Sequence, residues 1–183
     1  MKYIITGGPC VGKTSVLERL ASKGFETVSE SSRIVINNEK KKAEIDSSYK
    51  PIYPHTDLAE FQLLVLEQQK FSELNIKSYP VFLDRSFIDN LAYSALGKLE
   101  MNNVFSSFIE TAKYTGVFFL DRLPFYNKDS ARLEDCESAK RIHNTLFYFY
   151  QKSNIPIFRV RFFHGDDGVE KRANFILGKT GFV

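Results

Sequence analysis

The stretch of sequence that decides the fold is Gly7-Gly8-Pro9-Cys10-Val11-Gly12-Lys13-Thr14. It matches the pattern GxxxxGK[ST] without a substitution, and it lies between a short apolar run and a helix-forming stretch. Glycines in such a turn let backbone N–H groups curl around phosphate groups, and the N-terminus of the following helix adds a favourable dipole. The stretch therefore predicts a phosphate-binding loop between a buried strand and a helix.

The motif also suggests roles for its side chains. Lys13 can reach the β- and γ-phosphates of a nucleoside triphosphate, and the Thr14 hydroxyl can coordinate Mg²⁺. We expect ATP or GTP as the nucleotide, with Mg²⁺ as its metal. The alternative is a glycine-rich turn that holds no ligand. The residues expected to contact the nucleotide are consecutive: Gly7, Gly8, Pro9, Cys10, Val11, Gly12, Lys13, Thr14 and Ser15.

Short apolar runs alternate with helix-like stretches along the rest of the chain. We predict strands at residues 2–6, 25–29, 79–83, 116–120 and 155–163. We predict helices at residues 13–23, 58–76, 87–96, 104–114, 137–153 and 169–177. The polar stretch 37–57 contains two prolines and predicts a long loop. This alternation is typical of a parallel sheet with helices on both faces, so we expect one doubly wound α/β domain over residues 1–183.

Composition narrows the classes of function. The formal net charge of +3 is mildly basic, and it lacks the clustered excess typical of a nucleic-acid binder, so a nucleic-acid partner is not expected. No apolar run approaches the roughly 18 residues that a membrane span needs. A disulfide at Cys10 would hinder the phosphate loop, so Cys10 and Cys136 indicate a reduced, cytoplasmic protein. The run 40–42 of three lysines is interpreted as a solvated loop or helix end.

A second candidate site follows the predicted strand 79–83. Asp84 and Arg85 stand at its carboxyl end, where ligands of open α/β sheets bind. Asp84 could be the acidic partner of Mg²⁺ or the general base for an acceptor hydroxyl. Arg85 could clamp a phosphate with two hydrogen bonds and stabilise charge during transfer. The alternative is a strand-end ion pair or a helix cap.

The segment Asp84-Arg85-Ser86-x-x-Asp89-x-x-Ala92-Tyr93 resembles the DR-containing segment of P-loop nucleoside and nucleotide kinases. Further segments match in order: residues 28–33, Phe61-Gln62, Asp129-x-x-Arg132-x-Glu134 and Arg141-Ile142-His143. Together with the phosphate loop they resemble the NadR-like group of the AAA-domain family, small P-loop ATPases and kinases that include the ribosylnicotinamide-kinase domain of the bacterial NAD regulator. The resemblance extends over almost the entire chain.

The resemblance implies a P-loop kinase fold with the parallel strand order 2-3-1-4-5 and binding of ATP or GTP. It leaves the acceptor open. Glu30 stands where many nucleoside kinases place an acidic residue, so it could take a proton from an attacking hydroxyl or hold an acceptor sugar. Its spacing from Arg33 also fits a plain surface salt bridge. The residues that we expect to bind the acceptor are Glu30, Arg33, Gln62 and Asp89.

Residues 123–136 lie between the fourth predicted strand and a long helix, where P-loop kinases carry a lid that brings an arginine over the phosphates. Arg132 is the first choice for that arginine, and Arg122 and Lys128 are weaker candidates. The alternative is an ordinary solvated loop. The aromatic run 147–150 is interpreted as core packing in preference to a platform for base stacking.

Two functions compete. In the first, the protein is a kinase that transfers the γ-phosphoryl group to a small nucleoside- or nucleotide-like molecule. In the second, it is a regulatory nucleotide-dependent switch that acts through a protein partner. No guanine-specificity motif of the NKxD type is present, which argues against a standard small GTPase. For the kinase, the candidate catalytic residues are Lys13, Glu30, Asp84, Arg85 and Arg132.

Overall fold

The computed structural model describes residues 1–99, 113–124 and 136–182. At its centre is a five-stranded parallel sheet in the order β2-β3-β1-β4-β5. The α/β class and the strand order 2-3-1-4-5 expected from the resemblance are therefore confirmed. The strands are β1 (Lys2–Thr6), β2 (Glu26–Val28), β3 (Val81–Asp84), β4 (Gly116–Leu120) and β5 (Ile157–Val160).

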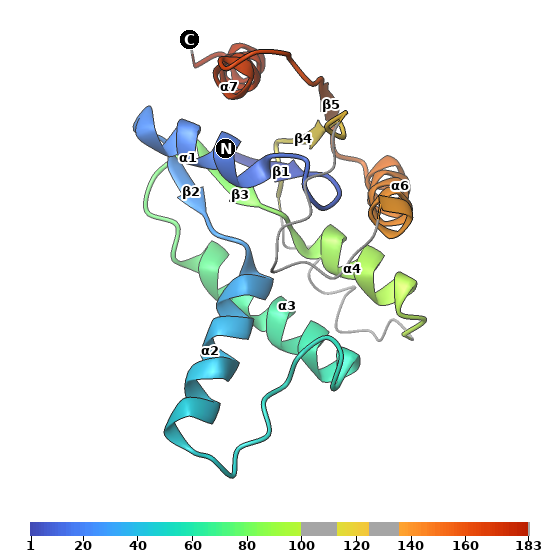
Figure 1. Cartoon of the computed structure of the whole chain (residues 1–183). Helices are drawn as coiled ribbons and strands as arrows, with labels where there is room; N and C mark the ends of the chain where they lie inside the picture. The colour runs from blue at the N-terminus through green and yellow to red at the C-terminus, as the bar shows by residue number, and fades with distance from the viewer. Residues whose placement is uncertain (100–112, 125–135, 183) are drawn as a thin grey trace.

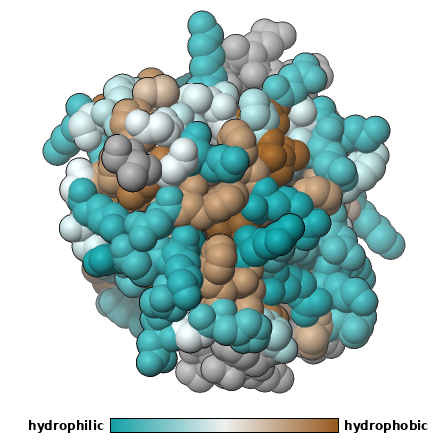
Figure 2. All heavy atoms as spheres, turned by 90° about the horizontal axis from the view of Figure 1, so that it is seen from above, coloured by the Kyte–Doolittle hydropathy of each residue, from teal (hydrophilic) through white to brown (hydrophobic). Residues whose placement is uncertain are grey.

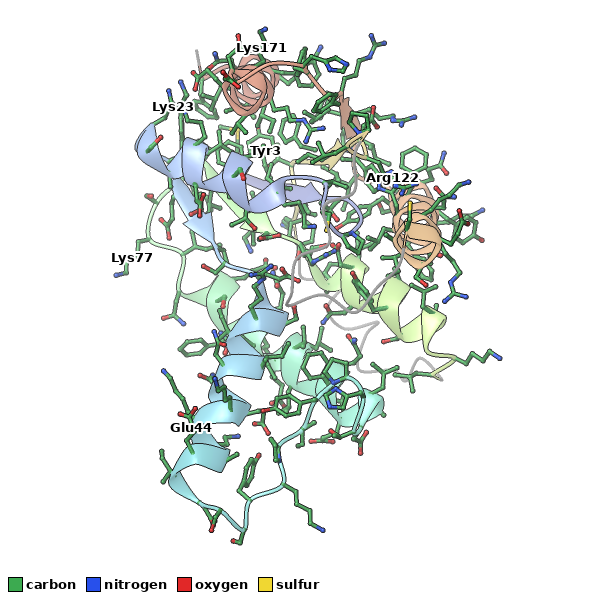
Figure 3. The ribbon with its side chains drawn as sticks, in the orientation of Figure 1. Tyr3, Lys23, Glu44, Lys77, Arg122 and Lys171 are labelled. Carbon is green, nitrogen blue, oxygen red and sulfur yellow. The ribbon has the colours of Figure 1, made fainter. Side chains whose placement is uncertain are left out.

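Helices cover both faces of the sheet (Figure 1). On one face lie α1 (Lys13–Ser22) and α7 (Gly168–Thr180), and on the other lie α3 (Leu58–Leu74), α4 (Phe87–Leu96) and α6 (Cys136–Lys152). Successive strand residues point to opposite faces, so β1 and β4 each contribute to both of the apolar clusters that cover the sheet. Tyr3 (labelled in Figure 3) and Ile5 pack toward α1 and α7. Ile4 packs toward α4 and α6.

The predicted loop at 37–57 is wrong over its first part, because α2 (Ser31–Ile45) continues through it. These residues are polar but are mostly good helix formers. Glu39 is only 1% exposed, and its carboxylate accepts hydrogen bonds from Lys42 Nζ (2.7 Å), Tyr49 Oη (2.7 Å) and the Ile52 backbone N–H (2.9 Å). The buried carboxylate thus ties the irregular residues 46–57 to the helix.

Together, α2 and α3 extend side by side away from the sheet (Figure 1). Val35 of α2 packs against Phe61 and Val65 of α3 in a small apolar cluster separate from the two that cover the sheet. The run of three lysines lies in the last turns of α2, as one of its two interpretations expected. Since α2 begins one residue after Glu30, this projection starts at the edge of the candidate site.

The remaining elements agree with the sequence within a few residues. The predicted helix 104–114 lies almost entirely outside the described residues. In the aromatic run of α6, Phe147 and Phe149 pack partly buried against the core and Tyr150 is fully buried, so core packing is confirmed for these residues. Tyr148 is exposed.

The outer surface is mixed in character. Figure 2 shows hydrophobic side chains running through the middle of a mainly hydrophilic face. In the described parts of the chain, no helix combines the length and the apolar character needed to cross a membrane.

We expect Phe118→Ala to cost about 3–5 kcal/mol of unfolding free energy, because it leaves a cavity in a fully buried part of the sheet. The Phe118 ring is 0% exposed and lies 5.8 Å from the Tyr3 ring and 5.3 Å from the Phe158 ring, measured between centroids. Urea unfolding of the two proteins measures the difference. As a control, Ile45→Ala, at an 87% exposed side chain, should stay within about 0.5 kcal/mol of wild type. Equal losses in both variants would contradict the assignment of the core.

Candidate functional site

The phosphate-loop motif forms a tight turn between β1 and α1. Gly7, Cys10 and Gly12 have φ values of 141°, 58° and 85°, so the backbone reverses its curvature repeatedly. A Cβ at Gly7 would lie 2.8 Å from the Leu120 carbonyl oxygen, which only glycine avoids. A backbone of this kind directs N–H groups into a concave nest suited to anions. Thr14 is exposed on the first turn of α1, at the edge of that nest.

A histidine on α6 holds the outer side of the loop. The Gly8 N–H donates to His143 Nδ1 at 3.2 Å, and a Cβ at Gly8 would lie 2.8 Å from the His143 Cβ. Burial, with the positive charge of Arg122 adding to it, lowers the pKa of His143 to about 4. The imidazole is therefore neutral at physiological pH and can accept this bond. In the sequence, His143 was noted only as part of a segment that resembles the kinase family, and no role was expected for it.

Lys13 lies inside the loop. Its side chain is buried, and Nζ donates to the carbonyl oxygens of Gly7 (3.3 Å) and Gly8 (3.0 Å). Burial and the nearby Arg85 lower the pKa of Lys13 to about 8, against the opposing effect of the Asp84 and Glu30 carboxylates. Because an ammonium group has three donors, Lys13 keeps the capacity to contact a phosphate oxygen.

Asp84 ends β3, in register with Ile5 of β1, and lies beside the loop. It is 6% exposed, and Oδ1 has no hydrogen-bond partner among the described residues. Burial raises the pKa of Asp84 to about 6, although Lys13 counteracts part of the rise. A buried carboxylate oxygen without a partner is costly and calls for a ligand. The helix-cap alternative for Asp84 is wrong, because the N-cap of α4 is Ser86.

The orphaned Oδ1 also provides a test of whether Mg²⁺ fits. Mg²⁺ prefers oxygen ligands, and it is commonly held by one or two carboxylates together with phosphate oxygens and water. The buried Asp84 carboxylate and the exposed Thr14 hydroxyl at the start of α1 are oxygen ligands of that kind. The residues present therefore fit the metal expected from the motif.

Arg85 links the candidate carboxylates to the loop. Its backbone is left-handed (φ 72°), and its buried guanidinium donates from Nε to Glu30 Oε1 (3.0 Å). Nη1 donates to Asp89 Oδ1 (3.0 Å) and to the Gly7 carbonyl (3.4 Å). Within the described residues only Nη2 has no such bond, and the expected two-pronged phosphate clamp stays a prediction. The guanidinium sets the positions of Glu30 and Asp89.

Glu30 is held ionised at the N-terminus of α2. Its carboxylate accepts from Arg85, from Ser32 Oγ (2.8 Å) and from Arg33 Nε (3.3 Å). Burial alone would raise the pKa of Glu30, but the charges of Arg85 and Lys13 outweigh it and lower the pKa to about 2. The Arg33 side chain is 57% exposed, so it forms the outer surface of this pair, as the salt-bridge alternative expected.

The structure corrects the expected role of Asp89, which is 0% exposed and cannot touch a substrate. Its carboxylate accepts from Thr6 Oγ1 (2.6 Å), Arg85 Nη1 (3.0 Å), the Ser86 N–H (3.0 Å) and Tyr150 Oη. These bonds occupy the carboxylate, so Asp89 positions other residues. Gln62 is buried on α3 and forms no hydrogen bond with the site's described side chains, so its expected contact with the acceptor has no support.

Arg132 and most of the expected lid, residues 125–135, lie outside the described residues, so both stay predictions. Arg122, just before the expected lid, contacts Cys136 at its far end: Arg122 Nη2 lies 3.4 Å from the Cys136 carbonyl oxygen and 3.3 Å from the Cys136 Sγ. Figure 3 shows Arg122 beside α6. Both cysteines lie in the described residues and form no disulfide.

A separate hollow of about 480 Å³ opens between α2 and α3. Val35, Leu64 and Phe71 contribute apolar walls, and Lys41 and Glu67 lie among its polar lining. Among the described residues, none that line this hollow has a buried polar atom without a hydrogen-bond partner. The orphaned oxygen of Asp84 makes the phosphate-loop region the stronger candidate site.

Comparison with known proteins identifies the family and the fold. A family model described as an AAA domain matches residues 2–169. The solved deoxyadenosine kinase from M. mycoides, with dCMP and a flexible dCDP bound as products, has a TM-score of 0.66 at 16% identity over 100% of both chains. Thymidylate kinase from Ehrlichia chaffeensis has a TM-score of 0.64 at 13% identity over 98% of both chains. A search of curated proteins finds no match.

A third solved structure is NadR in complex with NR, with a TM-score of 0.71 and 18% identity. The alignment covers 98% of this chain and 51% of the NadR chain, so the chain spans about half of NadR. At these identities the three structures establish a shared fold, which confirms the kinase-like arrangement expected from the sequence.

We expect Asp84→Asn to raise stability in the absence of nucleotide and metal. The folded-state pKa of about 6 lies above the ordinary value of 3.8, so ionising Asp84 opposes folding. A difference of this size corresponds to roughly 3 kcal/mol, and we expect a gain of about 1–3 kcal/mol because the amide also needs partners. The gain should be complete above pH 6 and vanish as the pH falls toward 4.

Urea unfolding in EDTA between pH 4 and pH 8 measures this. Asp46→Asn is the matched control, because Ser48 donates to the Asp46 carboxylate and lowers its pKa. That substitution should give no gain at neutral pH. A loss of stability in Asp84→Asn at pH 8 would show that the carboxylate is well solvated or paired.

Proposed function

The chain belongs to the AAA-domain family, and we propose that it is a kinase which transfers the γ-phosphoryl group of ATP or GTP to a small-molecule acceptor. We propose a nucleoside- or nucleotide-like acceptor, because the structures with this fold include a deoxyadenosine kinase, a thymidylate kinase and NadR with bound NR. The observation that carries the proposal is the buried Oδ1 of Asp84, which has no hydrogen-bond partner in the described ranges and lies beside an intact phosphate loop.

The loop residues would bind and orient the triphosphate. Backbone N–H groups of the nest and the N-terminus of α1 would contact the phosphate oxygens, and Lys13 would move from the Gly7 and Gly8 carbonyls to the transferring group. Thr14 and Asp84 would hold Mg²⁺, which when bound neutralises charge on the β- and γ-phosphates. Positioning and charge neutralisation account for most of catalysis in phosphoryl transfer.

The two carboxylates at the site differ in basicity, which divides their roles. Glu30 has a pKa of about 2, so it is a weak base that can accept a hydrogen bond from an acceptor hydroxyl. Asp84 has a pKa of about 6 and is the better proton acceptor. In transfer, the hydroxyl loses its proton as its oxygen bonds to the γ-phosphorus, and the bond to the bridging oxygen breaks to release the diphosphate.

Asp84 cannot serve fully as both a metal ligand and a proton acceptor, and a pH profile separates the roles. A proton acceptor with a pKa of about 6 predicts that turnover at saturating Mg²⁺ declines below pH 6. A metal ligand loses its proton on binding, so its profile should move to lower pH as Mg²⁺ is increased.

A phosphoryl-transfer screen tests the function itself. The protein would be incubated with ATP or GTP labelled at the γ-phosphate and with nucleosides, nucleotides and ribosylnicotinamide in turn. We expect labelled product only with a matching acceptor. Phosphate release that is independent of every acceptor would favour the nucleotide-dependent switch.

Lys13→Ala should reduce turnover by at least about a hundred-fold and weaken triphosphate binding, because the loop loses the charge that meets the phosphates. Circular dichroism checks that the variant stays folded, and steady-state kinetics and calorimetry measure the two effects. Lys77→Ala is the control, since this exposed lysine lies away from the loop (Figure 3). Unchanged binding and turnover in a folded Lys13→Ala protein would show that Lys13 does not bind the nucleotide.

Asp84→Asn should act mainly on turnover. An amide keeps the size of the carboxylate but loses the charge needed to hold metal or accept a proton, so kcat should fall by at least about a hundred-fold. Binding of the nucleotide without metal should change by only a few-fold. Equal activity of wild type and variant across a Mg²⁺ titration would show that Asp84 has no part in the chemistry.

A further inference from the structure

Arg172 on α7 contacts the phosphate loop, and no sequence motif predicts this contact. Its side chain is 3% exposed, and each of its nitrogen atoms donates to a backbone carbonyl. Nη1 donates to Val11 at 2.5 Å, Nε to Arg161 at 2.9 Å and Nη2 to Asp121 at 3.1 Å. In the described part of the chain it forms no ion pair with a carboxylate. A buried guanidinium thus joins the phosphate loop to the chain just beyond β4 and β5.

A charge is not needed to pack this position. The other buried residues of α7 are Ala173, Ile176 and Leu177, which fill the apolar cluster on that face of the sheet. Beyond its carbonyl partners, the guanidinium lies over the Phe162 ring, 5.9 Å from the ring centroid, and the Asp121 charge favours it. Burying a cation without a paired carboxylate is still costly, and an apolar side chain of similar volume is often as stable or more stable. We therefore explain the presence of a cation at position 172 by its hydrogen bonds to backbone carbonyls, and not by packing.

That contact fixes the orientation of one peptide plane. The Val11 carbonyl and the Gly12 N–H belong to the same planar trans peptide, so they point in opposite directions. Arg172 holds the carbonyl from the α7 side, and a Cβ at Gly12 would lie 3.4 Å from Nη1. The Gly12 N–H is thereby turned away from α7, and it forms no hydrogen bond with the described residues.

The peptide between Gly7 and Gly8, near the start of the loop, is also held by side chains, but in the opposite sense. The Gly8 N–H donates outward to His143, and the Gly7 carbonyl of that peptide faces inward, where it accepts from Lys13 Nζ. Side chains from α6 and α7 thus orient peptide planes near the two ends of the loop. Glycine offers little resistance to rotation, so without such contacts the plane at Gly12 would be poorly determined.

We infer that Arg172 is a positioning residue, which turns the Gly12 N–H toward the phosphate groups by holding the Val11 carbonyl. The inference rests on the proposed nucleotide-binding function. Anchoring to Asp121 and Arg161 at the ends of β4 and β5 makes the loop rigid before the ligand arrives. A donor that is already oriented needs no reorganisation on binding, which favours affinity.

The test compares Arg172→Met and Arg172→Lys with wild type. Calorimetry with Mg²⁺ and non-hydrolysable ATP and GTP analogues gives the Kd, and ¹H–¹⁵N NMR reports the Gly12 amide. In wild type we expect the Gly12 amide signal to move downfield as it bonds to phosphate. Arg172→Met should raise the Kd at least about ten-fold and reduce that movement, because the Val11 carbonyl loses its charge-assisted bond and the Gly12 N–H is no longer held toward the phosphate.

Arg172→Lys separates position from charge. Lysine keeps the charge, but one ammonium group cannot span the three carbonyls, so we expect an affinity between those of wild type and Arg172→Met. Ile176→Val is the matched control: it shortens a fully buried side chain on the same helix and should leave the Kd and the Gly12 signal unchanged. Melting temperatures of the unliganded proteins show whether each variant is folded.

Each outcome decides a separate question. If wild type binds neither the ATP nor the GTP analogue, the proposed function is wrong. If wild type binds and Arg172→Met binds within two-fold with the same Gly12 movement, the role of Arg172 is overturned. Wild-type affinity in Arg172→Lys would show that charge alone suffices and would overturn the positioning role, even if Arg172→Met fails to fold.

Discussion

The buried carboxylate of Asp89 is the interaction on which the site depends. It joins Thr6 at the end of β1, Arg85 after β3, the backbone at the start of α4, and Tyr150 of α6. A fully buried carboxylate is tolerated only where donors surround it, so these elements must meet in one arrangement. The phosphate loop begins one residue after Thr6, and its position relative to Arg85 follows from this arrangement.

The carboxylates of the site differ in their partners and therefore in their pKa values. Arg85 lies between Glu30 and Asp89, so Glu30 stays ionised with a low pKa. Asp84 directly precedes Arg85 in the chain, yet its Oδ1 has no hydrogen-bond partner among the described residues, and its pKa is raised. The site thus keeps one reactive carboxylate by satisfying the others. Local instability at Asp84 is what a ligand can relieve, and it is common for functional residues to be less stable than their surroundings.

The sequence predicted the parts of this site that are built from neighbouring residues. The loop 7–14 and the pair at 84–85 could be read directly, because strand, turn and helix follow one another within a few residues. Asp89 and Gln62 were expected among the acceptor contacts, and the structure places both as buried side chains. The resemblance of the segment 84–93 to kinases implied that Asp89 was near the site, but it could not show that Tyr150 and Thr6 would enclose it.

By itself, the sequence determined the α/β alternation, the phosphate loop and the position of Asp84 at a strand end, because each depends on local backbone geometry and hydrophobic periodicity. Only the tertiary structure decided that α2 continues through residues 37–45, where the buried Glu39 finds its partners in the following loop. It also decided that His143 and Arg172 hold the phosphate loop from outside. Val11 and Arg172 are 161 positions apart, and such contacts arise from the order in which strands and helices pack, which no local pattern records.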